Sequence, residues 1–244
     1  MKKVSFMVVF LLSAFLFTAC NQNMVSEKPM FSVEEPTAVP ADHGSPPSQM
    51  VFYSFNELKD FTSLMEGNSE DLYDYYYNHT ETLCCSGPKE AVAICSEKLD
   101  IRIPCADKFE DPSIEQIYMD SVNSCIDVWY HIGDYRYTFS CDPDINPDLE
   151  MSEDIRKEYE ADNVLYRSET PDKIIYMYAS NTYNPDCLYK GRIIMKDASI
   201  YIWILRDIDE DTGEYKDGGN PNVDLAQLEK FDFVIARDLL DQME

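Results

Sequence analysis

Two stretches in the middle of the chain alternate apolar and polar residues with a period of two. Apolar side chains recur at every second position over residues 126–132 and again over 135–141, with Gly133-Asp134 between them. This period is typical of strands with one buried face, and the short turn predicts an antiparallel hairpin. The turn sets a register in which Tyr130 pairs with Tyr137, and one face of the hairpin is then apolar throughout.

A second hairpin is predicted around Asp197-Ala198, because alternating apolar residues stand on both sides of this pair. With these two residues as the turn, Met195 faces Ile200, and Trp203 pairs with Arg192. We expect the contact between Trp203 and Arg192 to be a structural stack of a cation on an aromatic ring.

Helical signals precede and separate these strands. Residues 54–57 form a capping box, with Ser54 at the N-cap and Glu57 three positions later, and an apolar stripe with helical spacing follows to about Gly67. A second helix is predicted over residues 68–77. Further helical segments are predicted at residues 152–160 and 224–229.

These elements together predict an α+β domain over residues 51–244. We expect an antiparallel sheet of about five to seven strands, with the N-terminal helices packed on one face. The run 173–180 is apolar at both odd and even positions, which favours a central strand covered on both faces. Residues 231–235 are read as a last strand in preference to a continued helix.

The N-terminus has the pattern of an export signal. Two lysines precede an uncharged run of apolar residues, which ends in Phe17-Thr18-Ala19-Cys20. This ending resembles the lipobox of bacterial lipoproteins. The resemblance implies that the signal peptide is residues 1–19 and that Cys20 carries the lipid, palmitate or a similar acyl chain. The protein is then held on the outer face of the bacterial cell membrane; an ordinary secretory signal is the alternative.

Residues 20–50 contain several prolines and few large apolar residues, and so predict a disordered tether behind the lipidated cysteine. The start of the following domain, FYSFNELKDF, together with the tether and the lipobox, resembles small uncharacterised lipoproteins of anaerobic Gram-positive bacteria. The likeness lies in this overall arrangement of segments and includes no catalytic motif.

The chain is strongly acidic. It has 20 Lys and Arg against 46 Asp and Glu in 244 residues, a formal net charge of −26. A nucleic-acid partner is therefore excluded, because phosphate recognition needs a basic surface. A cationic ligand or protein is the partner that such a field would attract.

Seven cysteines follow Cys20, an odd number, in a chain predicted to be exported. A disulfide is expected between Cys84 or Cys85 and Cys95 or Cys105, whereas Cys125 and Cys141 fall on opposite faces of the first hairpin and should not pair. The spacing of these cysteines does not match a zinc site, and no metal or other cofactor is predicted.

One acidic stretch has oxygen side chains at calcium-loop spacing. The candidate ligands are Asp142, Asp144, Asn146, Asp148 and Glu153. Pro147 stands where the calcium loop needs a glycine with positive φ, so a proline-rich acidic turn is the simpler interpretation.

No motif for nucleophilic, metal or phosphate chemistry is present, and we expect a protein that is not an enzyme. The candidate binding residues are Trp129, His131 and Arg136, which share the polar face of the first hairpin. The predicted function is a binding or envelope-associated module. The alternatives are a carrier of an apolar ligand and a hydrolase of the cell envelope without a recognisable motif.

Overall fold

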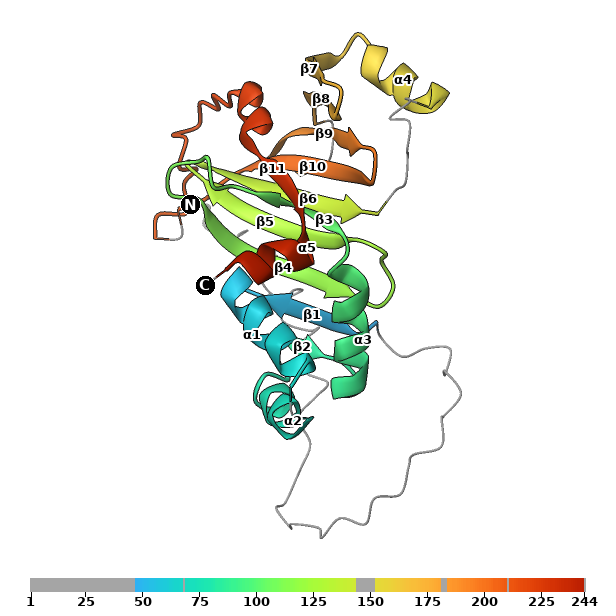
Figure 1. Ribbon diagram of the computed structural model, residues 1–244. Coiled ribbons are helices and arrows are strands. Elements are labelled where there is room, and N and C mark those ends of the chain that lie inside the picture. Colours follow the sequence, from blue (N-terminus) through green and yellow to red (C-terminus); the bar gives the residue numbers. More distant parts are fainter. Residues whose placement is uncertain (1–46, 68, 144–151, 181–183, 210, 244) are drawn as a thin grey trace, which may run out of the picture. The chain divides into compact units, whose positions relative to one another are not determined.

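The computed structural model describes residues 47–67, 69–143, 152–180, 184–209 and 211–243 (Figure 1). Its main feature is a nine-stranded sheet in which every pair of neighbours is antiparallel. In spatial order the strands are β2 (Leu83–Cys84), β1 (Gln49–Phe52), β4 (Ser113–Asp120), β5 (Ile126–Ile132), β6 (Tyr135–Asp142), β10 (Ala198–Arg206), β9 (Cys187–Met195), β8 (Lys173–Ala179) and β7 (Val164–Glu169).

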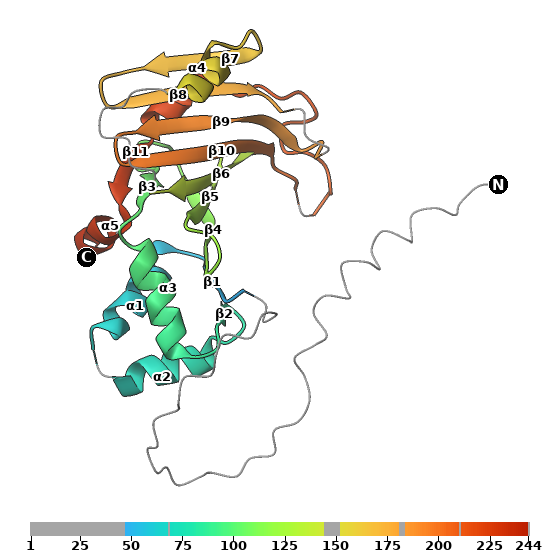
Figure 2. The same ribbon diagram turned by 90° about the vertical axis from the view of Figure 1, so that its right-hand side faces the viewer.

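A two-stranded antiparallel sheet and several helices complete the described part of the chain. The small sheet pairs β3 (Arg102–Cys105) with β11 (Asp232–Ile235). The helices are α1 (Phe55–Met65), α2 (Ser69–Asn78), α3 (Pro88–Lys98), α4 (Glu153–Glu160), the 3₁₀ helix η1 (Leu225–Lys230) and α5 (Ala236–Gln242). Helices α1, α2 and α3 gather beside β1 and β2, whereas α4 lies beside β7 (Figures 1 and 2). None of these described helices is long and apolar enough to cross a bilayer.

The α+β class is confirmed, but the large sheet has more strands than the five to seven expected. The strands that the sequence pattern missed are short or irregular. Strand β2 has two residues, and β-bulges interrupt β4 between Ile114 and Gln116 and β7 between Val164 and Tyr166. A bulge adds one residue to a strand, so the period of two is lost at that point.

The first hairpin has the predicted register, with Tyr130 opposite Tyr137, and Gly133 supplies the positive φ of 60° that its turn requires. The register predicted for the second hairpin is wrong by two residues. Met195 pairs with Ala198, so the turn is Lys196-Asp197 and not Asp197-Ala198. A shift by two leaves every side chain on its original face, and the hydrophobic pattern therefore cannot detect it.

The predicted start of α1 is confirmed. Ser54 is the N-cap, and its Oγ accepts a hydrogen bond of 3.1 Å from the backbone N–H of Glu57. The Glu57 carboxylate in turn accepts from the N–H of Tyr53, 2.7 Å away and one residue before the expected donor. The segment predicted as a helix at residues 224–229 is the 3₁₀ helix η1, and residues 232–235 form a strand, as predicted.

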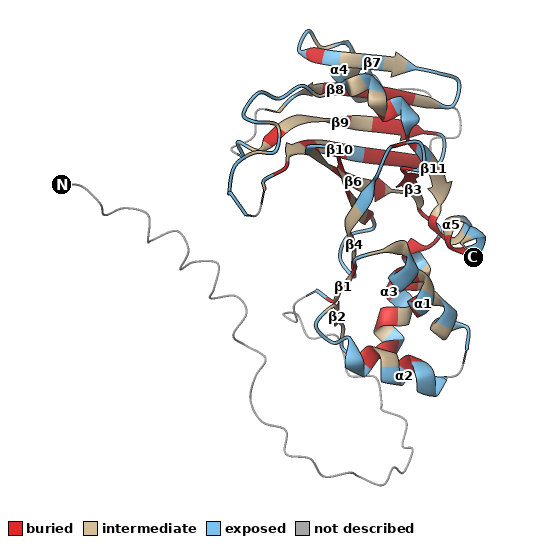
Figure 3. Ribbon diagram, turned by 90° about the vertical axis from the view of Figure 1, so that its left-hand side faces the viewer, coloured by how far each residue is buried: buried red, intermediate tan, exposed pale blue. Residues whose placement is uncertain are grey.

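The main core lies on one face of the large sheet, which we call the core face. Alternate residues of the central strands meet apolar side chains of α1, α2, α3 and α5 there, and Phe231 packs against Phe139 with ring centroids 4.8 Å apart. Figure 3 shows how buried residues follow the strands β8, β9 and β10. The first regular element of the described residues starts at Gln49, two residues before the predicted domain start, because Met50 and Phe52 of β1 belong to this core.

A smaller core lies on the opposite face, where α4 packs against β7, β8 and β9. Ile174 and Tyr176 of β8 face α4, and the Tyr159 and Tyr176 rings meet edge to face. Ile175 and Met177 point to the main core. The prediction that this strand is covered on both faces is confirmed, but the strand is next to the edge of the sheet and not at its centre.

Candidate functional site

The three predicted binding residues lie together on the face of the sheet opposite the main core, which we call the open face. Trp129, His131 and Arg136 are all half-buried. His131 and Arg136 are direct cross-strand partners on β5 and β6, and the Arg136 guanidinium lies over the Trp129 ring, 5.3 Å from its centroid. The alternation of the hairpin places these side chains on one surface, as expected.

His131 is held between two carboxylates that come from other parts of the chain. Its Nδ1 lies 2.9 Å from Asp207, and its Nε2 lies 3.2 Å from Glu115. Glu115 also contacts Arg136 at 3.3 Å, and Lys216 donates to Asp207 at 2.6 Å. Because each ring nitrogen already has a carboxylate partner, this histidine has no free nitrogen for metal binding or for general acid–base chemistry.

Burial raises the pKa of the Asp207 carboxyl group, but the hydrogen bonds from Lys216 and His131 outweigh burial and lower it overall. The same contact raises the pKa of Lys216. The cluster of Glu115, His131, Arg136, Asp207 and Lys216 is therefore an ion network that ties β4, β5 and β6 to the chain after β10. We read it as a structural support at the edge of the open face.

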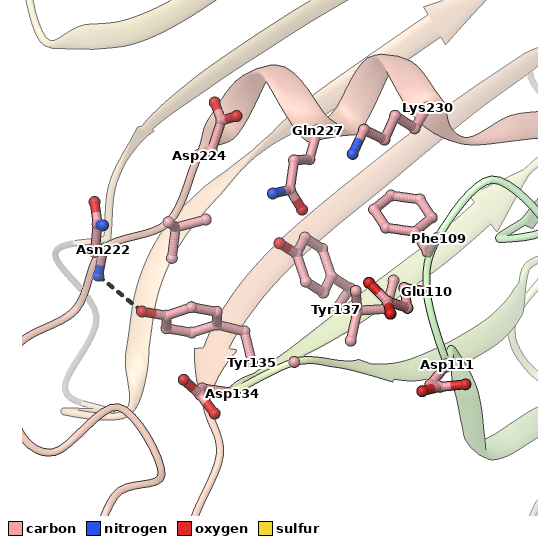
Figure 4. Close-up of a pocket in the computed structure, with 13 residues that line it drawn as sticks. Phe109, Glu110, Asp111, Asp134, Tyr135, Tyr137, Asn222, Asp224, Gln227 and Lys230 are labelled. Atoms are coloured by element: carbon pink, nitrogen blue, oxygen red, sulfur yellow. Dashed lines mark hydrogen bonds between the residues drawn. The ribbon is translucent and has the colours of Figure 1, made fainter.

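A pocket of about 640 Å³ opens on the other side of the same hairpin (Figure 4). Its volume lies within the range of roughly 300–1,000 Å³ found for small-molecule sites. Three segments far apart in the sequence line it. They are the loop before β4 (residues 109–111), the end of the β5–β6 hairpin (residues 132–135 and Tyr137) and the segment that leads through η1 (residues 222–230).

Aromatic rings and carboxylates dominate the lining of this pocket. Phe109, Tyr135 and Tyr137 supply the rings, and Gln227 and Lys230 of η1 point towards them (Figure 4). The hydroxyl of Tyr135 accepts a hydrogen bond of 2.7 Å from the backbone N–H of Asn222. The four acidic side chains of the lining, which outnumber its one lysine, are Glu110, Asp111, Asp134 and Asp224.

Two further features define what the pocket can bind. Burial raises the pKa of Tyr137 to about 12, so this hydroxyl keeps its proton at neutral pH and can donate a hydrogen bond. Asp111 holds a left-handed backbone with φ of 48°, which is uncommon outside glycine and positions the loop at the rim. Acids around aromatic rings form an environment that suits a positively charged group.

The sequence did not indicate this pocket. Each segment contributes side chains that are ordinary in an acidic, tyrosine-rich chain, and only the tertiary fold brings the segments together. The one local signal is the Gly133-Asp134 turn, and its pattern predicts a hairpin connection and not the wall of a site.

The predicted calcium loop falls mostly outside the described residues, since Asp144, Asn146 and Asp148 are not described. Asp142 is the last residue of β6, and Glu153 at the start of α4 pairs with Lys157 at 3.0 Å. Within the described part of the chain, no group of three or more His, Cys, Asp or Glu side chains is arranged to hold a metal ion. Cys20, the signal peptide and the tether as far as residue 46 also lie outside the described residues.

The predicted disulfide does not form. All seven cysteines after Cys20 are free thiols in the structure. Cys95 is fully buried in α3, where burial raises its pKa to about 12, whereas Cys84 is exposed on the edge strand β2. The Cys85 thiol donates to the backbone carbonyl of Gln49 at 3.8 Å. Cysteines that are close in sequence thus lie in different environments.

No protein-family model, no curated protein and no solved structure matches this chain. A functional proposal therefore rests on the geometry of the site.

Proposed function

We propose that the chain is a lipid-anchored, extracytoplasmic binding protein that takes a small cationic ligand into the pocket of Figure 4. The observation that carries this proposal is the lining of the pocket, in which four carboxylates and three aromatic rings surround a space of ligand size. Binding of a ligand is the function that this lining supports.

A ligand with a primary ammonium group and an apolar body fits this lining best. The ammonium group is attracted by the carboxylates and by the rings of Tyr135 and Tyr137, whereas the Phe109 ring already has the Lys230 ammonium 5.6 Å from its centroid. The net charge of −26 adds a long-range field that draws cations to the protein. An apolar ligand gains less, because its entry would remove carboxylates from water without a compensating charge.

The test uses three probes of similar shape and different charge, namely phenethylamine, 2-phenylethanol and phenylacetate. Binding to the full chain in mild detergent is measured by isothermal titration calorimetry. We expect phenethylamine to bind, 2-phenylethanol to bind more weakly and phenylacetate not to bind. Equal binding of the amine and the alcohol would remove the electrostatic basis of the proposal.

A pair of variants localises the site. Asp134→Asn, in the pocket wall, should weaken phenethylamine binding by about fivefold, since a partly solvated charge contact contributes on the order of 1 kcal/mol. Asp74→Asn removes the same charge at an exposed position of α2 and is the matched control. If both variants weaken binding equally, the amine responds to the overall field of the protein and not to this pocket.

A further inference from the structure

A continuous row of cross-strand partners crosses the open face of the sheet. Residues that pair directly in antiparallel strands point to the same face, so the registers of five strand pairs define which side chains stand side by side. Every member of the row is half-buried. From β4 to β8 the row consists of Gln116, Trp129, Thr138, Trp203, Lys190 and Tyr178.

Aromatic rings recur in this row at every second strand. Trp129 is on β5, Trp203 on β10 and Tyr178 on β8, with Thr138 and Lys190 on the strands between them. Neighbouring strands are about 4.8 Å apart, so successive rings are separated by roughly 9.5 Å. This spacing is close to the length of a disaccharide. It does not match an extended peptide, whose side chains on one face recur at about 6.8 Å.

The neighbouring row of cross-strand partners adds the ring of Tyr201 and the guanidinium of Arg192. Tyr201 stacks with Trp203 at a centroid distance of 6.2 Å and an angle of 23°, and the Arg192 guanidinium lies 4.6 Å above the Tyr201 ring. Lys190 lies 5.3 Å above the ring of Tyr178. The platform from β10 to β8 therefore presents rings and positive charges together, within a chain whose net charge is −26.

Unpartnered polar atoms gather on the same face. Among the described residues, the buried side-chain nitrogen and oxygen atoms that lack a hydrogen-bond partner belong to Asp127, Trp129, Arg136 and Arg192. All four residues point to the open face, because each is in register with the half-buried positions of the central strands. Buried polar groups without partners are rare in native proteins, and these four atoms lie beneath the surface of the open face, where a ligand resting on that face would not contact them.

We propose that the open face binds an extended acidic polysaccharide, laid across the strands along the row Trp129–Trp203–Tyr178. Sugar units contact the row at every second residue of the glycan, and its carboxylate groups meet Lys190 and Arg192, the cations that lie over the rings of Tyr178 and Tyr201. The row ends at the smaller core under helix α4, against which Tyr178 packs. The platform is on the opposite face of the sheet from the pocket of Figure 4, so this proposal is independent of the cationic ligand.

The test measures binding of polygalacturonate, an acidic homopolymer, to the full chain in mild detergent by affinity gel electrophoresis. Dextran serves as the neutral polymer. We expect polygalacturonate to retard the protein and dextran not to retard it. Trp203→Ala should weaken retardation by about tenfold or more, because it removes the central ring of the row.

Two further variants keep the test independent of folding defects at Trp203. Thr138→Glu places a negative charge between the two indoles and should abolish retardation, whereas Tyr77→Ala removes an exposed ring of α2 and should leave it unchanged. Lys190→Gln should weaken polygalacturonate binding and reduce the dependence of that binding on salt. Lys89→Gln, at an exposed position of α3, should do neither. The proposal is overturned if polygalacturonate does not bind, if dextran binds equally well, or if Thr138→Glu has no effect.

Discussion

Gly191 of β9 is a position where the neighbouring strand β8 leaves no room for a side chain. A Cβ atom added there would lie 2.0 Å from the backbone carbonyl oxygen of Tyr176 and 2.5 Å from the Met177 sulfur. The neighbouring backbone would have to move, and overpacking of this kind costs about 1–3 kcal/mol. We therefore expect Gly191→Ala to lower the melting temperature of the protein clearly.

Gly87 provides the matched comparison for that substitution. Its φ of 171° is extended backbone that any residue adopts, and no atom lies within 4 Å of an added Cβ. Gly87 is the N-cap of α3, where alanine is less favourable than glycine, so Gly87→Ala should cost less than about 1 kcal/mol and less than Gly191→Ala. Equal effects of the two substitutions would contradict the close packing between β8 and β9.

The ion network around His131 makes a prediction about pH. The folded-state pKa of Asp207 is lowered, so its contacts with Lys216 and His131 stabilise the fold above the unfolded pKa of about 3.9 and lose this effect as the pH falls through the lower, folded value. Asp207→Asn should cost about 1–2 kcal/mol at pH 6. The melting temperatures of the two proteins should converge near pH 2–3, and a difference that persists there would mean that the contribution of Asp207 is not ionic.

The candidate residues illustrate what a sequence shows at this scale. Trp129, His131 and Arg136 could be grouped in advance, because a two-residue turn fixes their register and a period of two fixes their face. Their partners Glu115 and Asp207 could not be predicted. Glu115 lies at a bulge of β4, and Asp207 follows β10, 76 residues from His131.

Helix α1 offers a prediction at the level of a single element. Ser54 satisfies the N–H of Glu57 at the N-terminus, and removal of an N-cap side chain costs about 1 kcal/mol. Ser54→Ala should therefore destabilise the protein by that amount in chemical denaturation. Ser63→Ala is the control, since Ser63 only donates back to the carbonyl of Lys59 within the helix, and alanine has the higher helix propensity. A loss in the control as large as that in Ser54→Ala would argue against the capping role.

The two hairpins show why some elements were predictable in detail and others were not. The Gly133-Asp134 turn left one register with an apolar face, whereas the turn at Lys196-Asp197 competes with one shifted by two residues that buries the same side chains. The correct register makes Ala198 a fully buried partner of Met195, and it pairs Arg192 with Tyr201 and not with Trp203. The local pattern therefore predicts which face a side chain occupies more reliably than it predicts the cross-strand neighbour of that side chain.

At the scale of the whole molecule, two proposed ligands of opposite charge belong to opposite faces of one sheet. The acidic pocket lies beside η1, and the aromatic row crosses the other side of the same strands. A strongly negative protein would repel an acidic glycan at low ionic strength, and added salt screens that repulsion within a Debye length of about 8–10 Å. The balance between this repulsion and the local attraction of Lys190 and Arg192 will determine how glycan binding depends on salt.

The proposed attachment to the membrane gives the last prediction. If Cys20 is lipidated and the signal is then cleaved behind Ala19, several acyl chains hold the protein, because each buried CH₂ contributes about 0.8 kcal/mol and one chain alone is marginal. In a bacterial host, the wild-type chain should incorporate labelled palmitate and sediment with the membrane fraction. Cys20→Ser should lose the label and be processed less completely, because the cleavage step depends on the lipidated cysteine.

Cys84→Ser is the matched control for the anchor, because Cys84 is an exposed free thiol outside the N-terminal motif. It should keep both the label and the membrane association. Label retained in Cys20→Ser but lost in Cys84→Ser would show that a thiol of the folded domain carries the lipid. Cleavage without any label in the wild-type chain would instead indicate an ordinary secretory signal, and the two binding faces would then belong to a freely diffusing protein.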